Sequence, residues 1–339
     1  MVRKIRLHNF RNYGEKEIAF EPGINLIIGE NGIGKTNLLE AIFILLEGNS
    51  MRTADIKEAI KIGEEKAAIG GWFGKMLEKK AEAEIDKEEG LRRKPVHGMT
   101  AVSYMPDDVY LVRGSPEVRR RYLDETSCRV KIGYREVIRE YARILRQRNE
   151  AIKMVRKGAW GRESIRYWGP LLLERGTEIT EERAEIIRKT GETVNLYGRD
   201  WGAETIGIKY YSNLHHGAAG MAENEEKLRN LEDAEIRRGM SLLGPHRDEM
   251  RMSYGGRNAR SECSHGEQKI MSLLLKIAQA GIIEEYTGRK PVLLLDDCLS
   301  ELDRRNRSAL LRLLSGWDQV VITSTDDVEE ARGIERIYL

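Results

Sequence analysis

One short segment constrains the fold of this chain more than any other. Residues 29–36 follow the pattern G-x4-G-K-[ST] of a phosphate-binding loop. The apolar run 24–28 before it predicts a buried strand, and apolar residues at helical spacing after Lys35 predict a helix. Glycines let successive backbone N–H groups point at one anion, and the helix N-terminus adds its positive end. The sequence therefore predicts a nucleotide site built on strand, loop and helix.

The chemistry of a triphosphate assigns roles within this loop. We expect Lys35 to reach the β- and γ-phosphate oxygens as a point charge, with a direct part in catalysis. The hydroxyl of Thr36 is the expected Mg²⁺ ligand. The other expected contacts to ATP come from the same loop: Gly29, Glu30, Asn31, Gly32, Ile33, Gly34 and Asn37.

A second candidate site follows three leucines at 293–295, which end in Asp296 and Asp297. This is the Walker B arrangement, a buried strand followed by carboxylates. We expect Asp296 to hold Mg²⁺, directly or through water, and Asp297 to polarise the water that attacks the γ-phosphate. An acidic pair after a strand is by itself often a helix N-cap. The phosphate-binding loop in the same chain favours the magnesium interpretation.

A third segment, residues 264–269, begins a predicted helix with Ser264 and Gly266. A small hydroxyl residue and a glycine at a helix N-terminus suit a phosphate group. Ser264 with Glu267 three residues later also fits a capping box, which is the structural alternative. Its position shortly before the leucine strand favours a second phosphate contact.

Composition excludes a membrane-spanning chain. The 339 residues are 33% charged, with a net charge of +2 and a mean hydropathy of −0.52. The run 41–46 is far shorter than the roughly 18 apolar residues that span a bilayer, and no apolar signal segment opens the sequence. Three scattered cysteines, Cys128, Cys263 and Cys298, form no disulfide framework. We expect a cytoplasmic protein without a membrane partner.

Strand and helix patterns divide the chain into three parts. Short alternating runs at 67–73, 81–85 and 101–104 predict one small β-rich sheet. Helical patterns dominate the middle, and strand and helix alternate again towards the end. We therefore expect an α/β fold with mixed sheets and an inserted helical subdomain. The predicted parts are an N-terminal nucleotide-binding segment (1–115), a helical insert (116–240) and a C-terminal nucleotide-binding segment (241–339).

Charge is distributed unevenly along the chain. Residues 111–170 hold sixteen Lys and Arg against seven Asp and Glu, whereas residues 171–250 hold eleven against sixteen. Clustered basic residues favour a polyanion such as DNA, because they displace counterions from its phosphates. The expected DNA contacts lie on one face of a helix: Arg135, Arg139, Arg143 and Arg146. The alternative is that they pair with the acidic region of the same chain.

The order of these features resembles that of the P-loop ABC-type ATPase heads, and among them the RecF family. This family comprises bacterial recombination mediators related to the SMC and Rad50 heads. The matching landmarks cover nearly the whole chain: residues 9–13, 29–37, 39–41, 50–53, 106–108, 114–116, 119–124, 243–248, 264–269 and 296–303.

The resemblance implies a head-to-tail homodimer that forms with ATP. Ser264 and Gly266 of one subunit would cap the γ-phosphate that Lys35 of the other subunit holds. The segment 264–269, which we call the signature segment, also adds Gln268 and Lys269 to the nucleotide contacts that the resemblance implies. By resemblance, Arg11 lies near the nucleotide and Asp303 lies at the dimer interface, also near ATP.

The resemblance also implies a function in DNA repair and replication. The family binds duplex DNA, favours gapped single-strand/duplex junctions, and helps RecA load through RecR and RecO. We therefore expect a weak, DNA-stimulated ATPase. The local excess of basic residues fits binding to the DNA backbone without base readout.

Two departures from the ABC pattern predict slow turnover. Asp297 stands where many ABC ATPases carry a glutamate, and residues 323–325 offer hydroxyls where many carry a histidine. A hydroxyl does not act as a general base in the way that imidazole does. Two other interpretations stay open: a nucleotide-stabilised scaffold dimer that does not hydrolyse ATP, and the ATPase subunit of a transporter. The basic insert argues against the transporter.

Overall fold

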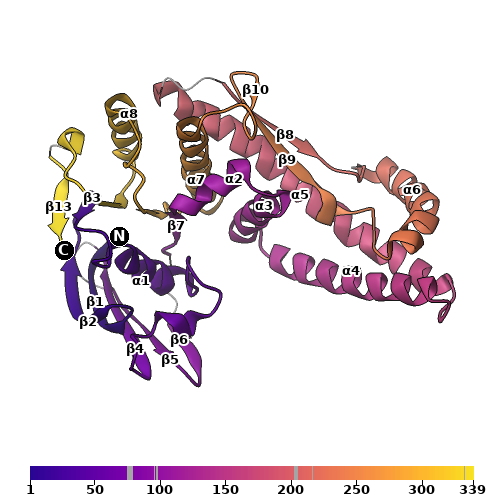
Figure 1. Cartoon of the computed structure of the whole chain (residues 1–339), viewed down its shortest axis with the longest axis horizontal. Helices are drawn as coiled ribbons and strands as arrows, with labels where there is room; N and C mark the ends of the chain where they lie inside the picture. The colour runs from indigo at the N-terminus through magenta and orange to yellow at the C-terminus, as the bar shows by residue number, and fades with distance from the viewer. Residues whose placement is uncertain (75–78, 95, 97, 202–204, 216, 332) are drawn as a thin grey trace. The chain divides into compact units, whose positions relative to one another are not determined.

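The computed structural model describes residues 1–74, 79–94, 96, 98–201, 205–215, 217–331 and 333–339 (Figure 1). The chain forms two compact units. Unit 1 comprises residues 1–109, 196–204 and 264–339, and unit 2 comprises residues 110–195 and 205–263. Unit 2 is therefore wider at both ends than the stretch 116–240 that the sequence predicted as an insert.

Unit 1 contains an antiparallel sheet whose strands follow the order β2-β1-β4-β5-β6. Burial alternates along its strands, so that one face joins the core and the other is exposed. Its strands are β1 (Val2–Phe10), β2 (Tyr13–Ala19), β4 (Lys66–Phe73), β5 (Lys79–Asp86) and β6 (Gly90–Arg93).

The second sheet of unit 1 is parallel, in the order β13-β3-β12-β11-β7. Its strands are β3 (Gly23–Ile28), β7 (Ala101–Tyr104), β11 (Val292–Leu295), β12 (Gln319–Ser324) and β13 (Glu335–Tyr338). The prediction that 101–104 joins the small β-rich sheet was wrong, because β7 pairs in parallel with β11. All four residues of β7 are buried, which suits a strand covered on both faces.

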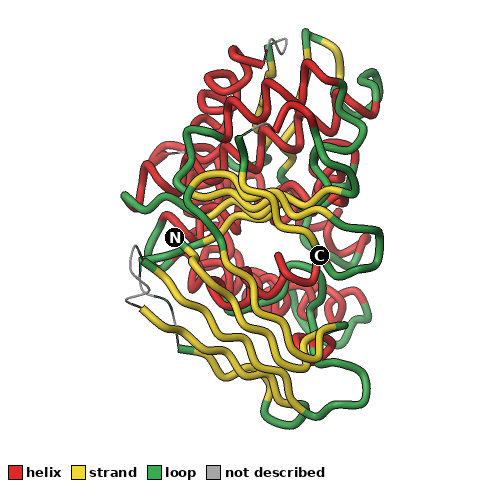
Figure 2. The backbone as a smooth tube through the Cα atoms, turned by 90° about the vertical axis from the view of Figure 1, so that its left-hand side faces the viewer, coloured by secondary structure: helices red, strands yellow, loops and turns green. Residues whose placement is uncertain are grey.

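Helix α1 (Lys35–Glu47) shares one apolar core with residues of both sheets, whose strands Figure 2 shows in yellow. It packs so closely against β4 that a Cβ atom at Gly71 would collide with Leu45. Such burial on several sides explains its nearly continuous apolar sequence. The other helices of unit 1 are η1 (Ile56–Ala59), η2 (Pro106–Val109), α7 (His265–Thr287), α8 (Arg304–Leu314) and η4 (Glu329–Ala331).

Unit 2 is mainly helical and also contains a sheet in the order β10-β9-β8. The strand β8 lies inside the stretch predicted as helical, where it pairs antiparallel with β9. The helices are α2 (Tyr110–Arg113), α3 (Pro116–Val130), α4 (Tyr134–Arg156), α5 (Glu163–Trp201), α6 (Gly217–Arg238) and η3 (Pro245–Arg247). The residues of α5 from 196 onwards belong to unit 1. The strands are β8 (Ile206–Tyr211), β9 (Glu249–Tyr254) and β10 (Arg257–Asn258). Within the described residues, no helix has the length and apolar character needed to cross a bilayer.

Candidate nucleotide-binding site

The parallel sheet of unit 1 brings the predicted motifs to one edge. Its strands β3, β11 and β12 run in the same direction, so their carboxyl ends lie together. The phosphate-binding loop leaves β3, the two aspartates leave β11, and Thr325 follows β12. A hollow of about 360 Å³ opens between these loops. The predicted residues that line it are Asn31, Gly32, Gly34, Lys35, Thr36, Asn37, Asp296 and Asp297.

The backbone of the phosphate-binding loop requires two of its glycines. Gly32 and Gly34 have φ angles of +82° and +118°, a region that side chains rarely adopt. A Cβ atom on Gly34 would also lie 2.7 Å from the Tyr13 hydroxyl. The ammonium of Lys35 donates to the carbonyl oxygens of Gly29 at 2.5 Å and Glu30 at 2.8 Å. The positive charge is therefore held within the curl of the loop.

Thr36 and Asp296 form an oxygen-rich pair beside the loop. The Thr36 hydroxyl lies 3.0 and 2.9 Å from the two carboxylate oxygens of Asp296. Thr323 donates to the same carboxylate at 2.6 Å. Hydroxyl and carboxylate oxygens are the ligands that Mg²⁺ prefers, so the side chains of Thr36 and Asp296 fit this ion.

Asp297 occupies a strained position at the edge of the hollow. Its φ is +46°, an uncommon value for a residue with a side chain. Its N–H donates to the Thr323 hydroxyl at 3.0 Å, and its carboxylate accepts from Ser300 Oγ at 2.9 Å. Thr323 thus contacts both aspartates from the strand where many ABC ATPases place a histidine.

Thr323 and Thr325, from the stretch that stands where many ABC ATPases carry a histidine, also line the hollow. Arg52 and Pro106 line it as well, although no sequence pattern assigned them a role there. Arg52 donates to Asn37 Oδ1 at 2.5 Å. Asn37 in turn donates to Asn12 Oδ1 at 2.9 Å, and Asn12 donates to the Ile33 carbonyl at 2.8 Å. The landmark 50–53 drew attention to Arg52, but only its position in the fold shows that it belongs to the site.

Arg11 is not among the lining residues of this hollow. Its guanidinium donates to both oxygens of the Glu40 carboxylate, at 2.9 and 2.7 Å, and to the Glu58 carbonyl at 2.6 Å. Glu40 lies on α1 and is fully buried. Ser50 Oγ donates to it at 2.5 Å, and Arg52 lies 3.6 Å away. Arg11 and Arg52 are therefore connected through one buried carboxylate, and the implied contact of Arg11 with nucleotide stays a prediction.

The signature segment begins α7 as predicted from its pattern. Ser264 is the N-cap: it accepts from the Glu267 N–H at 3.3 Å, while the Glu267 carboxylate accepts from the Ser264 N–H at 2.7 Å. A Cβ atom on Gly266 would meet no atom within 4 Å. Gln268 and Lys269 are buried within unit 1. The contacts of this segment with a second subunit stay predictions.

Asp303 is exposed and caps α8, accepting from the Asn306 N–H at 2.8 Å. This contact explains the residue locally. Its implied place at a dimer interface stays a prediction.

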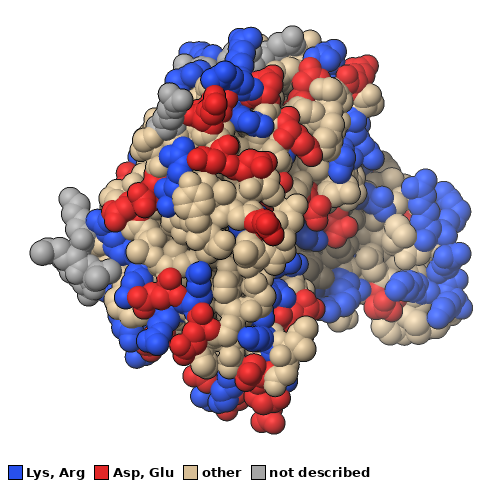
Figure 3. Space-filling model, turned by 60° about the vertical axis from the view of Figure 1, so that its left-hand side comes forward, with Lys and Arg blue, Asp and Glu red and all other residues tan. Residues whose placement is uncertain are grey.

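The four arginines predicted to bind DNA are exposed on α4. Within the described part of the chain they form one ion pair, Arg139 with Glu136 at 4.0 Å. A different arginine of α4 pairs with the acidic region: Arg148 is buried and lies 2.6 Å from Glu235. On the face drawn in Figure 3, Lys and Arg side chains gather at the right-hand edge and mixed charges cover the rest.

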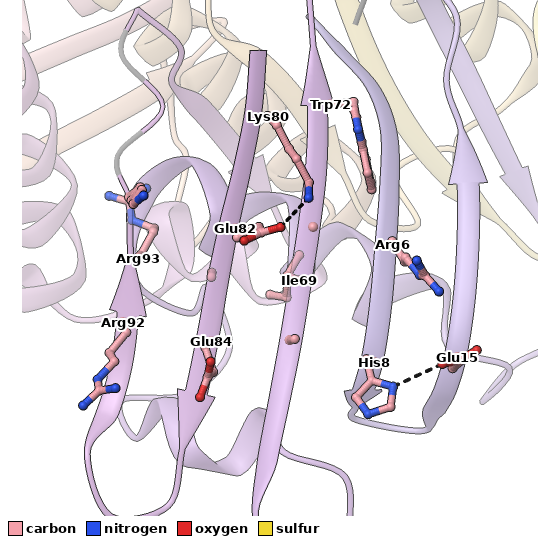
Figure 4. A pocket seen from close by; sticks show the side chains of 14 residues that line it. Arg6, His8, Glu15, Ile69, Trp72, Lys80, Glu82, Glu84, Arg92 and Arg93 are labelled. Atoms are coloured by element: carbon pink, nitrogen blue, oxygen red, sulfur yellow. Dashed lines mark ion pairs between the residues drawn. The ribbon is translucent and has the colours of Figure 1, made fainter. Parts of the chain in front are cut away.

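A second hollow, of about 750 Å³, lies on the exposed face of the antiparallel sheet (Figure 4). Acidic and basic side chains both line it, and two pairs form within the lining, Lys80 with Glu82 at 2.6 Å and His8 with Glu15 at 3.5 Å. This mixture of charges lacks the convergent N–H donors of a phosphate site.

The parallel sheet, the loop after β3 and the paired carboxylates after β11 define an ABC-type ATPase head. A family model described as RecF/RecN/SMC N terminal domain matches residues 1–338. The DNA replication and repair protein RecF of Listeria monocytogenes serotype 4b is 34% identical, over 96% of this chain and 92% of that protein. RecF of Bacillus velezensis is 32% identical, over 96% and 93%. The chain belongs to the RecF family of DNA replication and repair proteins.

Solved structures agree with this assignment. The recombination mediator protein RecF-ATPrS in the RecFOR pathway superposes with a TM-score of 0.85 at 27% identity, covering 100% of this chain and 96% of that one. RecF-ATP in the same pathway gives 0.82 at 28% identity, covering 97% and 92%. The SMC head bound to the C-winged helix domain of ScpA gives 0.55 at 16% identity, covering 99% and 93%, which shows a shared fold alone.

Proposed function

We propose that this protein binds ATP with Mg²⁺ in the hollow at the carboxyl edge of the parallel sheet. The observation that carries the proposal is the meeting of Lys35, Thr36 and Asp296 at that edge, with Thr36 and Asp296 2.9 Å apart. Thr36 and Asp296 would hold Mg²⁺, which neutralises charge on phosphate oxygens when bound. Lys35 would exchange its loop carbonyls for phosphate oxygens.

Hydrolysis in this proposal is slow. Asp297 orients the attacking water, and Ser300 and Thr323 fix the carboxylate and the backbone of Asp297. The stretch 323–325, where many ABC ATPases carry a histidine, offers hydroxyls only, and a hydroxyl orients groups but does not accept a proton readily. Bound ATP therefore acts as a switch, and slow hydrolysis sets how long the ATP-bound state lasts.

ATP also joins two copies of the chain in this proposal. Ser264 and Gly266 stand at the N-terminus of α7, where the open space around Gly266 admits close approach by a phosphate. In the dimer they cap the γ-phosphate held by Lys35 of the other copy. Because the γ-phosphate supplies the shared contacts, its loss separates the subunits.

The ATP-bound dimer binds duplex DNA and gapped junctions in the cytoplasm and helps RecA load with RecR and RecO. This part rests on family membership, on the exposed arginines of α4, and on the basic stretch 111–170. Binding to phosphates without base contacts predicts a strong dependence on salt.

One experiment tests this function as a whole. Binding to a fluorescent gapped duplex is titrated against salt with ATP, with ADP and without nucleotide. We expect tight binding with ATP and a steep loss of affinity as salt rises. Binding that is equal with ATP and ADP at every salt concentration contradicts the proposal.

The absence of the usual glutamate and histidine also favours a second candidate, a scaffold dimer that binds ATP without hydrolysing it. Phosphate release separates the two. The ATPase is supported if the intact protein releases phosphate and the Asp297→Asn variant does not. The scaffold is supported if neither protein releases phosphate.

A further inference from the structure

Lys269 points into its own subunit. It lies one turn into α7, and its side chain is 8% exposed. Its ammonium donates to the Ser300 carbonyl at 2.9 Å, to Ser300 Oγ at 3.2 Å and to the Asp297 carbonyl at 3.4 Å. The carboxylate of Glu301 lies 3.6 Å away. The contacts of this buried cation thus converge on one segment, residues 297–301.

That segment has a strained backbone at both ends. Asp297 and Glu301 have φ angles of +46° and +62°, values that residues with side chains seldom adopt. Such conformations persist only where the surroundings hold them. The buried ammonium provides this restraint mainly through the Ser300 carbonyl at 2.9 Å, which loses this partner if the loop relaxes. The Asp297 carbonyl lies 3.4 Å from the ammonium and also accepts from Ser300 Oγ at 3.0 Å.

The restraint continues to the carboxylate of Asp297 through one hydroxyl. Ser300 Oγ accepts from Lys269 at 3.2 Å, and its one proton faces two oxygens of Asp297: Oδ2 at 2.9 Å and the carbonyl oxygen at 3.0 Å. The hydrogen bond that Ser300 Oγ accepts from the charged ammonium orients the hydroxyl. It also strengthens the hydrogen bond that this hydroxyl donates. Lys269, Ser300 and Asp297 therefore form a chain from the signature helix to the edge of the nucleotide hollow, all within unit 1.

We infer that Lys269 is a positioning residue for hydrolysis, which acts by holding the segment 297–301 and, through Ser300, the carboxylate of Asp297. The inference rests on the proposed function, in which Asp297 orients the attacking water. It is an alternative to the nucleotide contact that the family resemblance implies for Lys269. It also links the helix that begins with Ser264 to the carboxylate of the same subunit's own ATP site.

The test measures ATP affinity and single-turnover phosphate release separately, with saturating ATP and Mg²⁺. Lys269→Met removes the ammonium and keeps most of the side-chain volume. We expect release on the order of tenfold to a hundredfold slower, as for a misplaced catalytic group, with ATP affinity within about twofold. Lys269→Arg retains a buried cation with several donors, and we expect it to restore most of the rate.

Lys276→Met is the matched control. Lys276 lies two turns further along α7 and its side chain is 11% exposed, but its ammonium faces Asp108 at 3.7 Å and not the segment 297–301. The Lys276→Met variant also removes a buried ammonium from α7. We therefore expect its thermal stability to change and its rate of phosphate release to stay the same.

Four outcomes decide the inference. A wild-type rate for Lys269→Met overturns it, provided that Asp297→Asn is slow, and the proposed function then stands. Weaker ATP binding by Lys269→Met at an unchanged rate overturns it in favour of a nucleotide contact. A wild-type rate for Asp297→Asn overturns both the role of Asp297 and this inference. Slow release by Lys269→Met, rescued by arginine and not further slowed by adding Asp297→Asn, supports it.

A second variant carries the test if Lys269→Met fails to fold. Ser300→Ala removes the hydroxyl between Lys269 and Asp297 and leaves the buried cation with its two carbonyl partners. We expect slower phosphate release with ATP affinity maintained. An unchanged rate for Ser300→Ala in that case overturns the inference.

Discussion

Replacement of Arg11 distinguishes a structural arginine from one that binds nucleotide. Arg11 makes two hydrogen bonds to Glu40, whose side chain is completely buried. Arg11→Met therefore leaves a buried carboxylate without its main cation. Breaking a buried ion pair from one side destabilises a protein by about 3–5 kcal/mol. Since Ser50 and Arg52 still face Glu40, we expect the lower end, about 3 kcal/mol.

The matched variant is Arg52→Met, because Arg52 faces the same carboxylate from 3.6 Å and is 38% exposed. We expect it to lower the free energy of unfolding by less than about 1 kcal/mol, because Arg11 stays paired with Glu40 and Arg52 is itself partly exposed. Because Arg52 lines the hollow, we expect ATP affinity to fall about tenfold, the value of one charge-assisted hydrogen bond.

Urea unfolding gives both free energies, and titration with a fluorescent ATP analogue gives both affinities. The reasoning is refuted if Arg11→Met loses less than about 1 kcal/mol, far below the value for a broken buried pair. It is refuted equally if Arg11→Met keeps its stability and loses ATP binding, since Arg11 would then contact the nucleotide.

Three further predictions concern the phosphate-binding loop, a buried histidine and α4. Gly34→Ala forces a side chain to a φ of +118° against Tyr13, so unfolding by urea should show a loss of at least about 1–2 kcal/mol. Gly266→Ala, in a helix with open space around the added Cβ atom, should keep or slightly raise stability. Burial lowers the pKa of His246 to about 4, so the folded protein keeps this side chain neutral where the unfolded chain would protonate it. The stabilisation is therefore complete above pH 6.5, and up to about 3 kcal/mol of it is lost as the pH falls towards 4. Urea unfolding of His246→Gln at several pH values should lack this part of the pH dependence. Arg139→Glu with Arg143→Glu should lower the slope of DNA affinity against salt by about one for each of the two arginines that binds a phosphate, and an unchanged slope would place the DNA surface elsewhere.

The local architecture of the site could be predicted because its determinants are adjacent in sequence. The strand before Gly29, the helix after Lys35 and the leucines before Asp296 each carry their own pattern. The capping box of Ser264 is likewise visible within four residues. Parallel pairing of the strands then places these segments at one edge of the sheet.

The long-range contacts could not be predicted in the same way. The residue pattern of β7 resembles that of the strands before it in sequence. Only its pairing with β11 shows which sheet it joins. Lys269 lies beside Ser264 in a segment that resembles a nucleotide contact, yet packing of α7 directs its ammonium to residues about 30 positions away. The sequence places Arg11 and Glu40 in separate landmarks, and the fold joins them.

The most direct test of the central claim is the mass of the protein in solution with ATP and Mg²⁺, measured by sedimentation on the Asp297→Asn variant, which we expect to hydrolyse ATP slowly. We predict that the mass doubles with ATP, stays that of one chain with ADP, and stays so with ATP when Lys35→Ala is added. A single-chain mass at saturating ATP, with the nucleotide shown to be bound, would contradict the account.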